Sequence, residues 1–189
     1  MIKVESFTMD HTKVKAPFVR KCGLLTGEKG DKVSKFDLRF MQPNEAAIPT
    51  AALHALEHLL AGYLREEVDN VIDLSPMGCR TGFYFIVWGD VAPETIQVAL
   101  INALKKVVNS TEVPAANAIQ CGNYRDLSLH GAIEYAKMVL EKFNSSLLIP
   151  NFYVMADNYL EKQYADYEKR RAEWERQKKF GKLPKTKKS

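Results

Sequence analysis

The run from His54 to His58, with the sequence HALEH, combines two imidazoles and a carboxylate at a spacing that suits metal chemistry. On a helix, residues three and four apart share a face, so His54, Glu57 and His58 can converge on one point. Two neutral imidazoles can hold a divalent transition metal, and a carboxylate beside them can transfer protons. Two surface histidines would be the ordinary explanation. However, residues 50–64 carry no other charge, which indicates a mostly buried helix whose polar cluster needs a partner such as a metal.

Two cysteines are candidates for the same chemistry. Cys79 lies in the glycine-rich turn 75–82 next to Arg80, and a partly exposed thiol beside a cation favours the thiolate form. A structural cysteine would explain this position equally well. Cys121 precedes Gly122 outside any strong periodic pattern, so packing gives little reason for it. A soft thiolate completes a two-imidazole site and leaves the fourth tetrahedral position for water or substrate.

Three kinds of site remain open from these residues alone. In a metallopeptidase, HxxEH is the inverted zincin motif, Glu57 activates water, and Glu134 is a candidate third ligand. In a metal-assisted isomerase or lyase, the metal polarises a carbonyl while Glu57 and Cys79 move protons. A structural zinc site in a binding module is the third. A second reactive cysteine favours the isomerase or lyase, and the spare carboxylate argues against a structural zinc.

The elements around these residues alternate between strands and helices. Residues 18–25 and 33–40 predict a hairpin with a one-sided core, because Phe36, Leu38 and Phe40 share a face. Arg39 then lies with Asp37 on the opposite face, which we expect to be solvated. Residues 6–12 read as a flexible polar leader. The remaining expected elements are a helix opened by Pro49 and Thr50, with Leu53, Leu56, Leu60 and Tyr63 opposite the histidines, strands over 68–74 and 83–88, and helices over 93–108 and 131–144.

Length and composition predict one globular domain. The chain has 189 residues, of which 46% are apolar and 26% charged. It has no apolar run of about eighteen residues and no secretory leader, so we expect no membrane partner and a cytoplasmic location. Three cysteines at long separations do not form a disulfide framework, and they indicate free thiols or metal ligands in a reducing compartment.

The net charge of +4 is unevenly divided. Residues 158–189 hold eleven Lys or Arg and five Asp or Glu, a net of +6, whereas residues 1–157 hold sixteen and eighteen, a net of −2. We therefore expect a near-neutral catalytic domain over 1–157 and a basic tail over 158–189, and nucleic acid is not an indicated partner. Packing periodicity from about Leu160 predicts a helical extension, and 178–188 is expected to be disordered.

Three ordered motifs together resemble one family. They are residues 49–61 around the histidines, residues 75–84 around Cys79, and the triplet Gln120-Cys121-Gly122. They closely resemble S-ribosylhomocysteine lyases, the LuxS family, and residues 10–14 and Arg39-Phe40 also fit. The resemblance covers about residues 4–125. Residues 123–158 resemble the family only loosely, and residues 160–189 have no counterpart in it.

The resemblance implies a role for each site residue and an architecture. His54, His58 and Cys121 would be the metal ligands, with Fe(II) in the cell and Zn(II) or Co(II) as substitutes. Glu57 and Cys79 would be the acid–base pair, Ser6, His11 and Arg39 would contact the ribose part, and Asp73 would contact the homocysteine amino group. The implied fold is α+β, with helices covering an antiparallel sheet, in a homodimer that has its sites at the subunit interface.

The resemblance also implies a reaction. The carbonyl of the opened sugar would move along the chain of S-ribosylhomocysteine by two enediolate shifts. Beta-elimination would then release homocysteine and leave 4,5-dihydroxy-2,3-pentanedione, the precursor of autoinducer-2. Such an enzyme would serve autoinducer synthesis in quorum sensing, the activated methyl cycle, or both.

Overall fold

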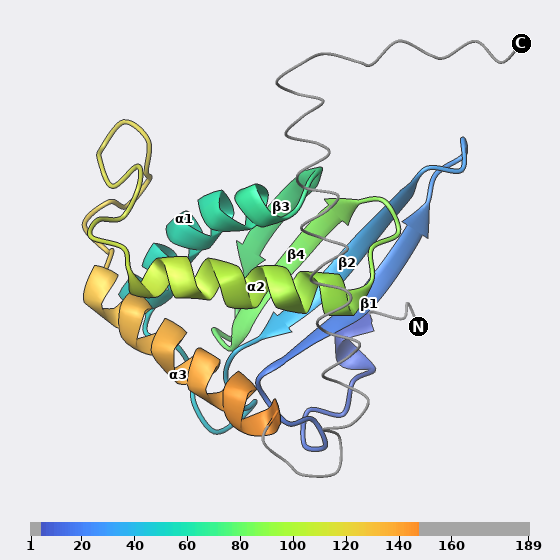
Figure 1. Ribbon diagram of the computed structural model, residues 1–189, viewed down its shortest axis with the longest axis horizontal. Helices are drawn as coiled ribbons and strands as arrows, with labels where there is room; N and C mark the ends of the chain where they lie inside the picture. The colour runs from blue at the N-terminus through green and yellow to red at the C-terminus, as the bar shows by residue number, and fades with distance from the viewer. Residues whose placement is uncertain (1–4, 148–189) are drawn as a thin grey trace, which may run out of the picture. The chain divides into compact units, whose positions relative to one another are not determined.

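The computed structural model describes residues 5–147. In chain order, these residues form η1 (Glu5–Phe7), β1 (Phe18–Thr26), β2 (Lys32–Arg39), α1 (Thr50–Glu67), β3 (Val71–Pro76), β4 (Gly82–Trp88), α2 (Pro93–Val108) and α3 (Leu129–Leu147). The four strands make one antiparallel sheet in the order β1-β2-β4-β3. The three α-helices lie on one side of this sheet (Figure 1). The expected α+β fold, with helices covering an antiparallel sheet, is confirmed.

The core lies between the sheet and the helices. Phe36 and Leu38 of β2 pair with Phe85 and Phe83 of β4, and all four side chains are fully buried. The expected hairpin of β1 and β2 is present with its one-sided core. Facing the sheet are buried apolar residues of all three helices, namely Leu53, Leu56, Leu60 and Leu64 of α1, Ile96, Leu100, Leu104 and Val107 of α2, and Ala132, Ala136, Val139 and Phe143 of α3. The predicted apolar stripe of α1 is confirmed for Leu53, Leu56 and Leu60, whereas the fourth predicted member, Tyr63, is only partly buried and packs against the core.

The start of α3 is fixed closely against α1. The Ser128 amide donates a hydrogen bond to the Ala51 carbonyl at 2.9 Å. A Cβ added at Gly131 would lie only 2.8 Å from the Ala52 Cβ, so glycine permits this approach. The contact matters for the site, because the loop between α2 and α3 carries Cys121 and is thereby held beside the histidines of α1.

The junction between β2 and β4 also depends on a glycine. Gly82 pairs with Arg39 across the sheet. A Cβ at Gly82 would collide with the Leu38 carbonyl oxygen and lie 3.0 Å from the Arg39 Cα. The close approach brings the turn 77–81, which carries Cys79, against the end of β2.

Arg39 is buried, contrary to the expectation of a solvated strand face. Its side chain does lie opposite Phe36 and Leu38, but Arg39 is 3% exposed and Asp37 is 1% exposed. The reason is that β1 and the segment before it contribute cover, which the alternation of β2 alone cannot reveal. Arg20 of β1 contacts Asp37 at 3.5 Å, and the Phe18 ring centroid lies 5.9 Å from the Arg39 guanidinium carbon.

The segment expected as a flexible leader is tied to the rest of the domain. Glu5 pairs with Arg20 at 2.6 Å. The Gln42 side chain donates to the Val14 carbonyl at 2.8 Å and accepts from the Ala16 amide at 3.0 Å. These contacts position the segment that carries Ser6 and His11. Its composition alone does not reveal that it is held in place.

Two predicted boundaries shift in the structure. The strand expected over 68–74 begins at Val71 and runs to Pro76, because α1 continues to Glu67 and Asn70 turns the chain with a φ of 59°. The helix expected over 131–144 is longer and spans Leu129–Leu147. The predicted domain boundary at 157/158 and the predicted helical tail lie outside the described residues.

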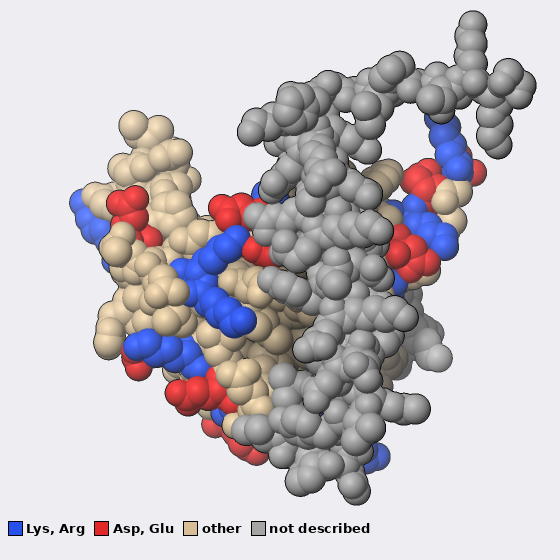
Figure 2. Space-filling view, viewed as in Figure 1, with Lys and Arg blue, Asp and Glu red and all other residues tan. Residues whose placement is uncertain are grey.

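The charge distribution agrees with a near-neutral body. On the face shown in Figure 2, basic and acidic side chains of the described residues lie interspersed. Asp90, for example, pairs with both Lys21 and Lys32, at 2.6 and 3.0 Å. Among the helices of residues 5–147, none is both long and apolar enough to cross a membrane.

Candidate functional site

His54 and His58 lie one turn apart on α1, with ring centroids 4.8 Å apart. Each ring is oriented by a backbone carbonyl: His54 Nδ1 lies 2.9 Å from the Asp126 oxygen, and His58 Nδ1 lies 2.8 Å from the Pro114 oxygen. A carbonyl can only accept a hydrogen bond, so both Nδ1 atoms carry the proton. In this tautomer the lone pair of each Nε2 atom is free to bind a metal.

Cys121 completes a cluster of three ligand atoms. Its sulfur lies 3.4 Å from His54 Nε2, and the ligand atoms of His54, His58 and Cys121 all lie within 4.8 Å of one another. The preceding loop is shaped by Asn117, whose side-chain oxygen accepts the amides of Ile119 and Gln120. Two imidazoles with their lone pairs free and one thiolate suit a tetrahedral transition metal with one open position.

Glu57 is half-buried on the same helix, three residues after His54. Within residues 5–147 no hydrogen bond or ion pair involves its carboxylate, which leaves it available as a proton carrier next to the cluster. Glu134, the third ligand of the peptidase alternative, is exposed on α3 and pairs with Lys137 at 2.8 Å. Lys137 lowers the pKa of Glu134, and Glu134 does not belong to the ligand cluster.

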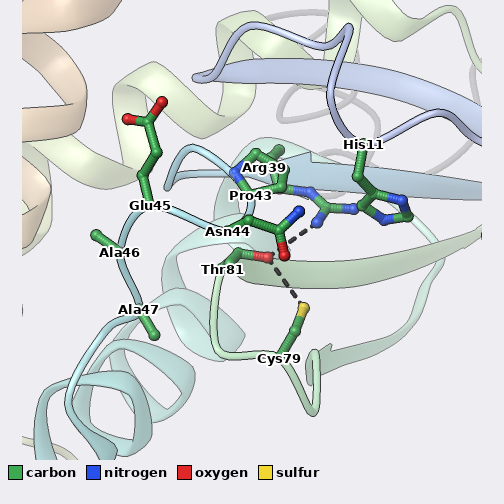
Figure 3. A pocket seen from close by; sticks show the side chains of 9 residues that line it. All are labelled: His11, Arg39, Pro43, Asn44, Glu45, Ala46, Ala47, Cys79 and Thr81. Atoms are coloured by element: carbon green, nitrogen blue, oxygen red, sulfur yellow. Dashed lines mark hydrogen bonds between the residues drawn. The ribbon is translucent and has the colours of Figure 1, made fainter.

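Cys79 lies in a separate pocket of about 610 Å³. The pocket is lined by His11, Arg39, Pro43, Asn44, Glu45, Ala46, Ala47, Cys79 and Thr81 (Figure 3). Figure 3 shows the Thr81 hydroxyl between the Arg39 guanidinium and the Cys79 sulfur. Of the nine predicted site residues, His11, Arg39 and Cys79 line this pocket, whereas His54, His58 and Cys121 lie outside its lining.

Arg39 is held rigidly at the floor of this pocket. It donates to both carboxylate oxygens of Asp37, at 3.1 and 2.8 Å, and to the Thr81 hydroxyl at 2.9 Å. Burial disfavours the charged guanidinium, but the hydrogen bonds and charge of Asp37 outweigh it and raise the pKa of Arg39, with a further contribution from Cys79. The pocket therefore contains a fixed positive charge, which suits an oxygen-rich substrate.

The other residues predicted to contact the substrate are His11 and Ser6, which precede β1, and Asp73 of β3. His11 donates from Nδ1 to the Met9 carbonyl at 3.0 Å, which leaves Nε2 free to accept. Ser6 is hydrogen-bonded to Tyr84, whose pKa is raised mainly by burial despite that bond. Asp73 is exposed on β3, accepts a hydrogen bond from the Ser75 hydroxyl, and is absent from the residues that line the pocket.

Comparison with known proteins identifies the family. The S-ribosylhomocysteinase (LuxS) family model matches residues 4–148. The chain is 70% identical to an S-ribosylhomocysteine lyase of Clostridioides difficile over 142 residues, which cover 75% of this chain and 94% of that relative. Lyases of the same name from Clostridium botulinum and Enterococcus faecalis are 63% and 57% identical, again over 75% of this chain and over 94% and 93% of theirs.

The chain belongs to the S-ribosylhomocysteinase (LuxS) family. The predicted resemblance and the assignment to a family of carbon–sulfur lyases are confirmed. The predicted extent was wrong, because the LuxS match continues to residue 148 rather than ending near 125. Residues 125–148 include α3. Apolar residues on its packing face can be exchanged for other apolar residues, so this helix carries no distinctive motif in a single sequence.

Sequence reasoning missed two residues that contact Arg39, namely Asp37 and Thr81. Asp37 and Arg39 are two apart on a strand and so share a face, which is a usable signal for a pair. Thr81 offers no such signal, because its role depends on the turn that sets Cys79 beside Arg39. Arg80, which the sequence placed beside the thiol, is exposed with a φ of 58°, and in the described part of the chain the cation linked to Cys79 is Arg39.

Proposed function

We propose that this chain is a metal-dependent S-ribosylhomocysteine lyase. It would release homocysteine and leave 4,5-dihydroxy-2,3-pentanedione by carbonyl migration and beta-elimination. The observation that carries the proposal is the His54–His58–Cys121 cluster, in a chain 70% identical to a lyase of that name. A pocket with a buried arginine and a thiol supplies the further groups that such a substrate needs.

His54, His58 and Cys121 would hold the metal, which we propose is Fe(II) in the cell, with Zn(II) or Co(II) as substitutes. A His-His-Cys set accepts several such metals, so availability decides which one is bound. When bound, the metal would polarise a carbonyl oxygen of the substrate as a Lewis acid. The two carbonyls that accept from the Nδ1 atoms keep both imidazoles aimed at the ion.

Glu57 and Cys79 would move protons between neighbouring carbons of the sugar chain. Each carbonyl shift removes a proton at one carbon and delivers one at the next, a task that the two carriers would share. Arg39 donates to oxygen atoms from a fixed position, and we propose that it contacts the ribose part together with His11 and Ser6. Asp73, an exposed carboxylate, would contact the positively charged amino group of the homocysteine part.

A homodimer with sites at the interface is supported by the separation of the two halves of the site. The metal cluster and the pocket of Cys79 do not share lining residues within the described chain. Exposed apolar side chains flank both halves: Phe7, next to Ser6, is 84% exposed, and Ile119, near Cys121, is 96% exposed. We propose that a second copy covers these exposed apolar side chains.

We further propose a cytoplasmic enzyme that supplies the autoinducer-2 precursor and recycles homocysteine in the activated methyl cycle. The cysteines of the described residues are free thiols, which suits a reducing compartment. Relatives of the same name occur in several bacteria, where such a product could act between cells.

The test is an anaerobic assay of the full chain loaded with Fe(II) or Co(II), in which S-ribosylhomocysteine is supplied and thiol release is followed. We expect steady release of homocysteine. In Cys121→Ala, metal affinity should fall at least about a hundredfold, because a ligand is lost rather than an outer partner. Cys22→Ala, which removes a half-buried thiol of β1, is the matched control and should keep one metal per chain by elemental analysis.

Two results would contradict the proposal. One is a metal-loaded wild type that releases no homocysteine. The other is a Cys121→Ala variant that retains its metal while Glu134→Ala loses it, since this would return the third ligand to the peptidase arrangement.

A further inference from the structure

Thr81 occupies a position between two functional groups. Thr81 as a whole residue is 4% exposed, and it lines the same pocket as Arg39 and Cys79. Its hydroxyl oxygen lies 2.9 Å from Arg39 Nη1 and 3.0 Å from the Cys79 sulfur. No other described side chain is hydrogen-bonded to both.

The direction of these hydrogen bonds follows from the donors available. Arg39 has no lone pair to offer, so its Nη1 donates and the Thr81 oxygen accepts. A hydroxyl has a single proton, and a thiolate has none. Once Cys79 has given up its proton, only Thr81 can donate in the contact between oxygen and sulfur, so the chain of donors runs from Arg39 through Thr81 to Cys79.

The backbone holds Thr81 in this place. The Thr81 carbonyl accepts the amides of Phe40 and Met41, both at 2.9 Å. The next residue, Gly82, begins β4 and pairs with Arg39. The backbone of Thr81 is therefore fixed at the end of the sheet, and the hydrogen bonds with Arg39 and Cys79 hold its hydroxyl group before substrate arrives.

We propose that Thr81 is a positioning residue that couples the Arg39 guanidinium to the Cys79 sulfur through its hydroxyl group. A hydrogen bond to a charged sulfur stabilises the thiolate, and the arginine polarises the donor that makes it. Asp37 supports the arrangement by holding Arg39 on two atoms. The other ionisable groups lining the pocket are His11 and Glu45, and Arg80 is the chain neighbour of Cys79.

The inference rests on the proposed function only for its consequence in turnover. Its direct readout is the reactivity of Cys79 in metal-loaded protein without substrate, measured as the rate of iodoacetamide alkylation at neutral pH by peptide mass spectrometry. Cys22 is an internal reference in the same molecule, because burial raises the pKa of that thiol and it lies on β1.

The decisive variant is Thr81→Val, which keeps the branched shape and removes the hydroxyl. We expect alkylation of Cys79 to slow about tenfold, as for the loss of a hydrogen bond to a charged group, while the rate at Cys22 is unchanged. Thr81→Ser should restore the wild-type rate to within about twofold. In the lyase assay, Thr81→Val should lower kcat with a smaller change in KM, because the group acts through Cys79.

Ser34→Ala is the matched control for the loss of a buried hydroxyl. Ser34 is fully buried on β2 and donates to the Gly89 carbonyl at 2.7 Å, away from the pocket. It should leave Cys79 alkylation unchanged. If Thr81→Val does not fold, Thr81→Ala provides the same comparison.

Wild-type alkylation of Cys79 in Thr81→Val or Thr81→Ala would overturn the inference, whatever the activity. A failure of the proposed function would give a different result. The wild-type protein would release no homocysteine, although its Cys79 would still be alkylated faster than Cys79 of Thr81→Val.

Discussion

A buried carboxylate and a buried guanidinium, Asp37 and Arg39, make the residue-scale feature on which the thiol pocket depends. Their two-point contact fixes the plane of the guanidinium, and so fixes which nitrogen is left for Thr81. Burying such a pair costs desolvation that only good geometry offsets. The proposed contact of Arg39 with the ribose part of the substrate would explain why a buried ion pair, and not an apolar pair, stands at this place.

The first prediction concerns this pair. Asp37→Asn should lower the free energy of unfolding by about 3 kcal/mol, because it leaves the Arg39 charge buried with a weaker partner. Glu5→Gln is the control, since it breaks a pair that is 36% and 42% exposed at its two side chains and should cost less than about 1 kcal/mol. Urea denaturation of both variants would measure the difference. Equal losses would mean that Asp37 contributes no more than a surface carboxylate.

Sequence reasoning predicted the cluster of His54, His58 and Cys121 but not this pair, and the reason is physical. The two histidines are identified by their local spacing and Cys121 by its residue type and by the family resemblance, all of which a sequence contains directly. The burial of Arg39 depends on Phe18, Arg20 and the segment before them, which lie about twenty residues earlier in the chain. Alternation along one strand tells which face a side chain occupies, but it cannot tell whether another segment covers that face.

At the scale of elements, the sequence predicted which segments form helices and which form strands, but it did not predict how neighbouring elements contact one another. The helix 93–108 and the hairpin of β1 and β2 appear with nearly their predicted bounds, because periodicity and strand-forming residues determine them. The register that sets Gly82 against Arg39 and the seating of α3 on Ala52 were not predictable. Both are close approaches permitted by the absence of a Cβ, and only three-dimensional packing reveals them.

A group of charged side chains links α1 to α2. Lys106 of α2 reaches Glu66 and Glu67 at the end of α1, at 2.8 and 2.6 Å. The Glu67 side chain is 3% exposed, whereas that of Lys106 is 35% exposed. Burial opposes the charge on Lys106, but the hydrogen bonds with Glu66 and Glu67 outweigh it and raise the pKa of Lys106 above its ordinary value.

A pH-dependent prediction follows for Lys106→Met. Near pH 7 this variant should lose about 1 kcal/mol of stability, a value kept low because water screens the half-exposed lysine. A folded pKa above the unfolded one means that the contribution is complete below the unfolded pKa and disappears as the pH rises through the folded pKa. The difference from wild type should therefore shrink as the pH rises above the ordinary pKa of lysine, as followed by urea denaturation.

Lys105→Met provides the control on the same helix. Lys105 is exposed, so its loss should change stability little at either pH. A Lys106→Met difference that stays constant up to high pH would show that the lysine acts through its hydrocarbon chain and not through its charge.

At the scale of the whole molecule, the two halves of the site pose a question of assembly. The metal cluster is formed by α1 and by the loop between α2 and α3 that carries Cys121, whereas the pocket with Cys79 lies at the end of β2 and the start of β4. In the proposed mechanism, Glu57 and Cys79 would both have to reach one substrate, since each carbonyl shift would use them in turn. A twofold dimer would satisfy this if one copy supplied the cluster and the other supplied the pocket.

Mixing two inactive variants tests this arrangement. Cys79→Ala and Cys121→Ala chains, each without lyase activity alone, should regain about a quarter of wild-type activity after subunit exchange, because half of the dimers would be mixed and one of their two sites would be intact. The activity should appear only on mixing and should grow at the rate of exchange, followed with differently tagged chains. If both halves of a site come from one copy, every mixed dimer carries two damaged sites, and no activity will return however long the exchange proceeds.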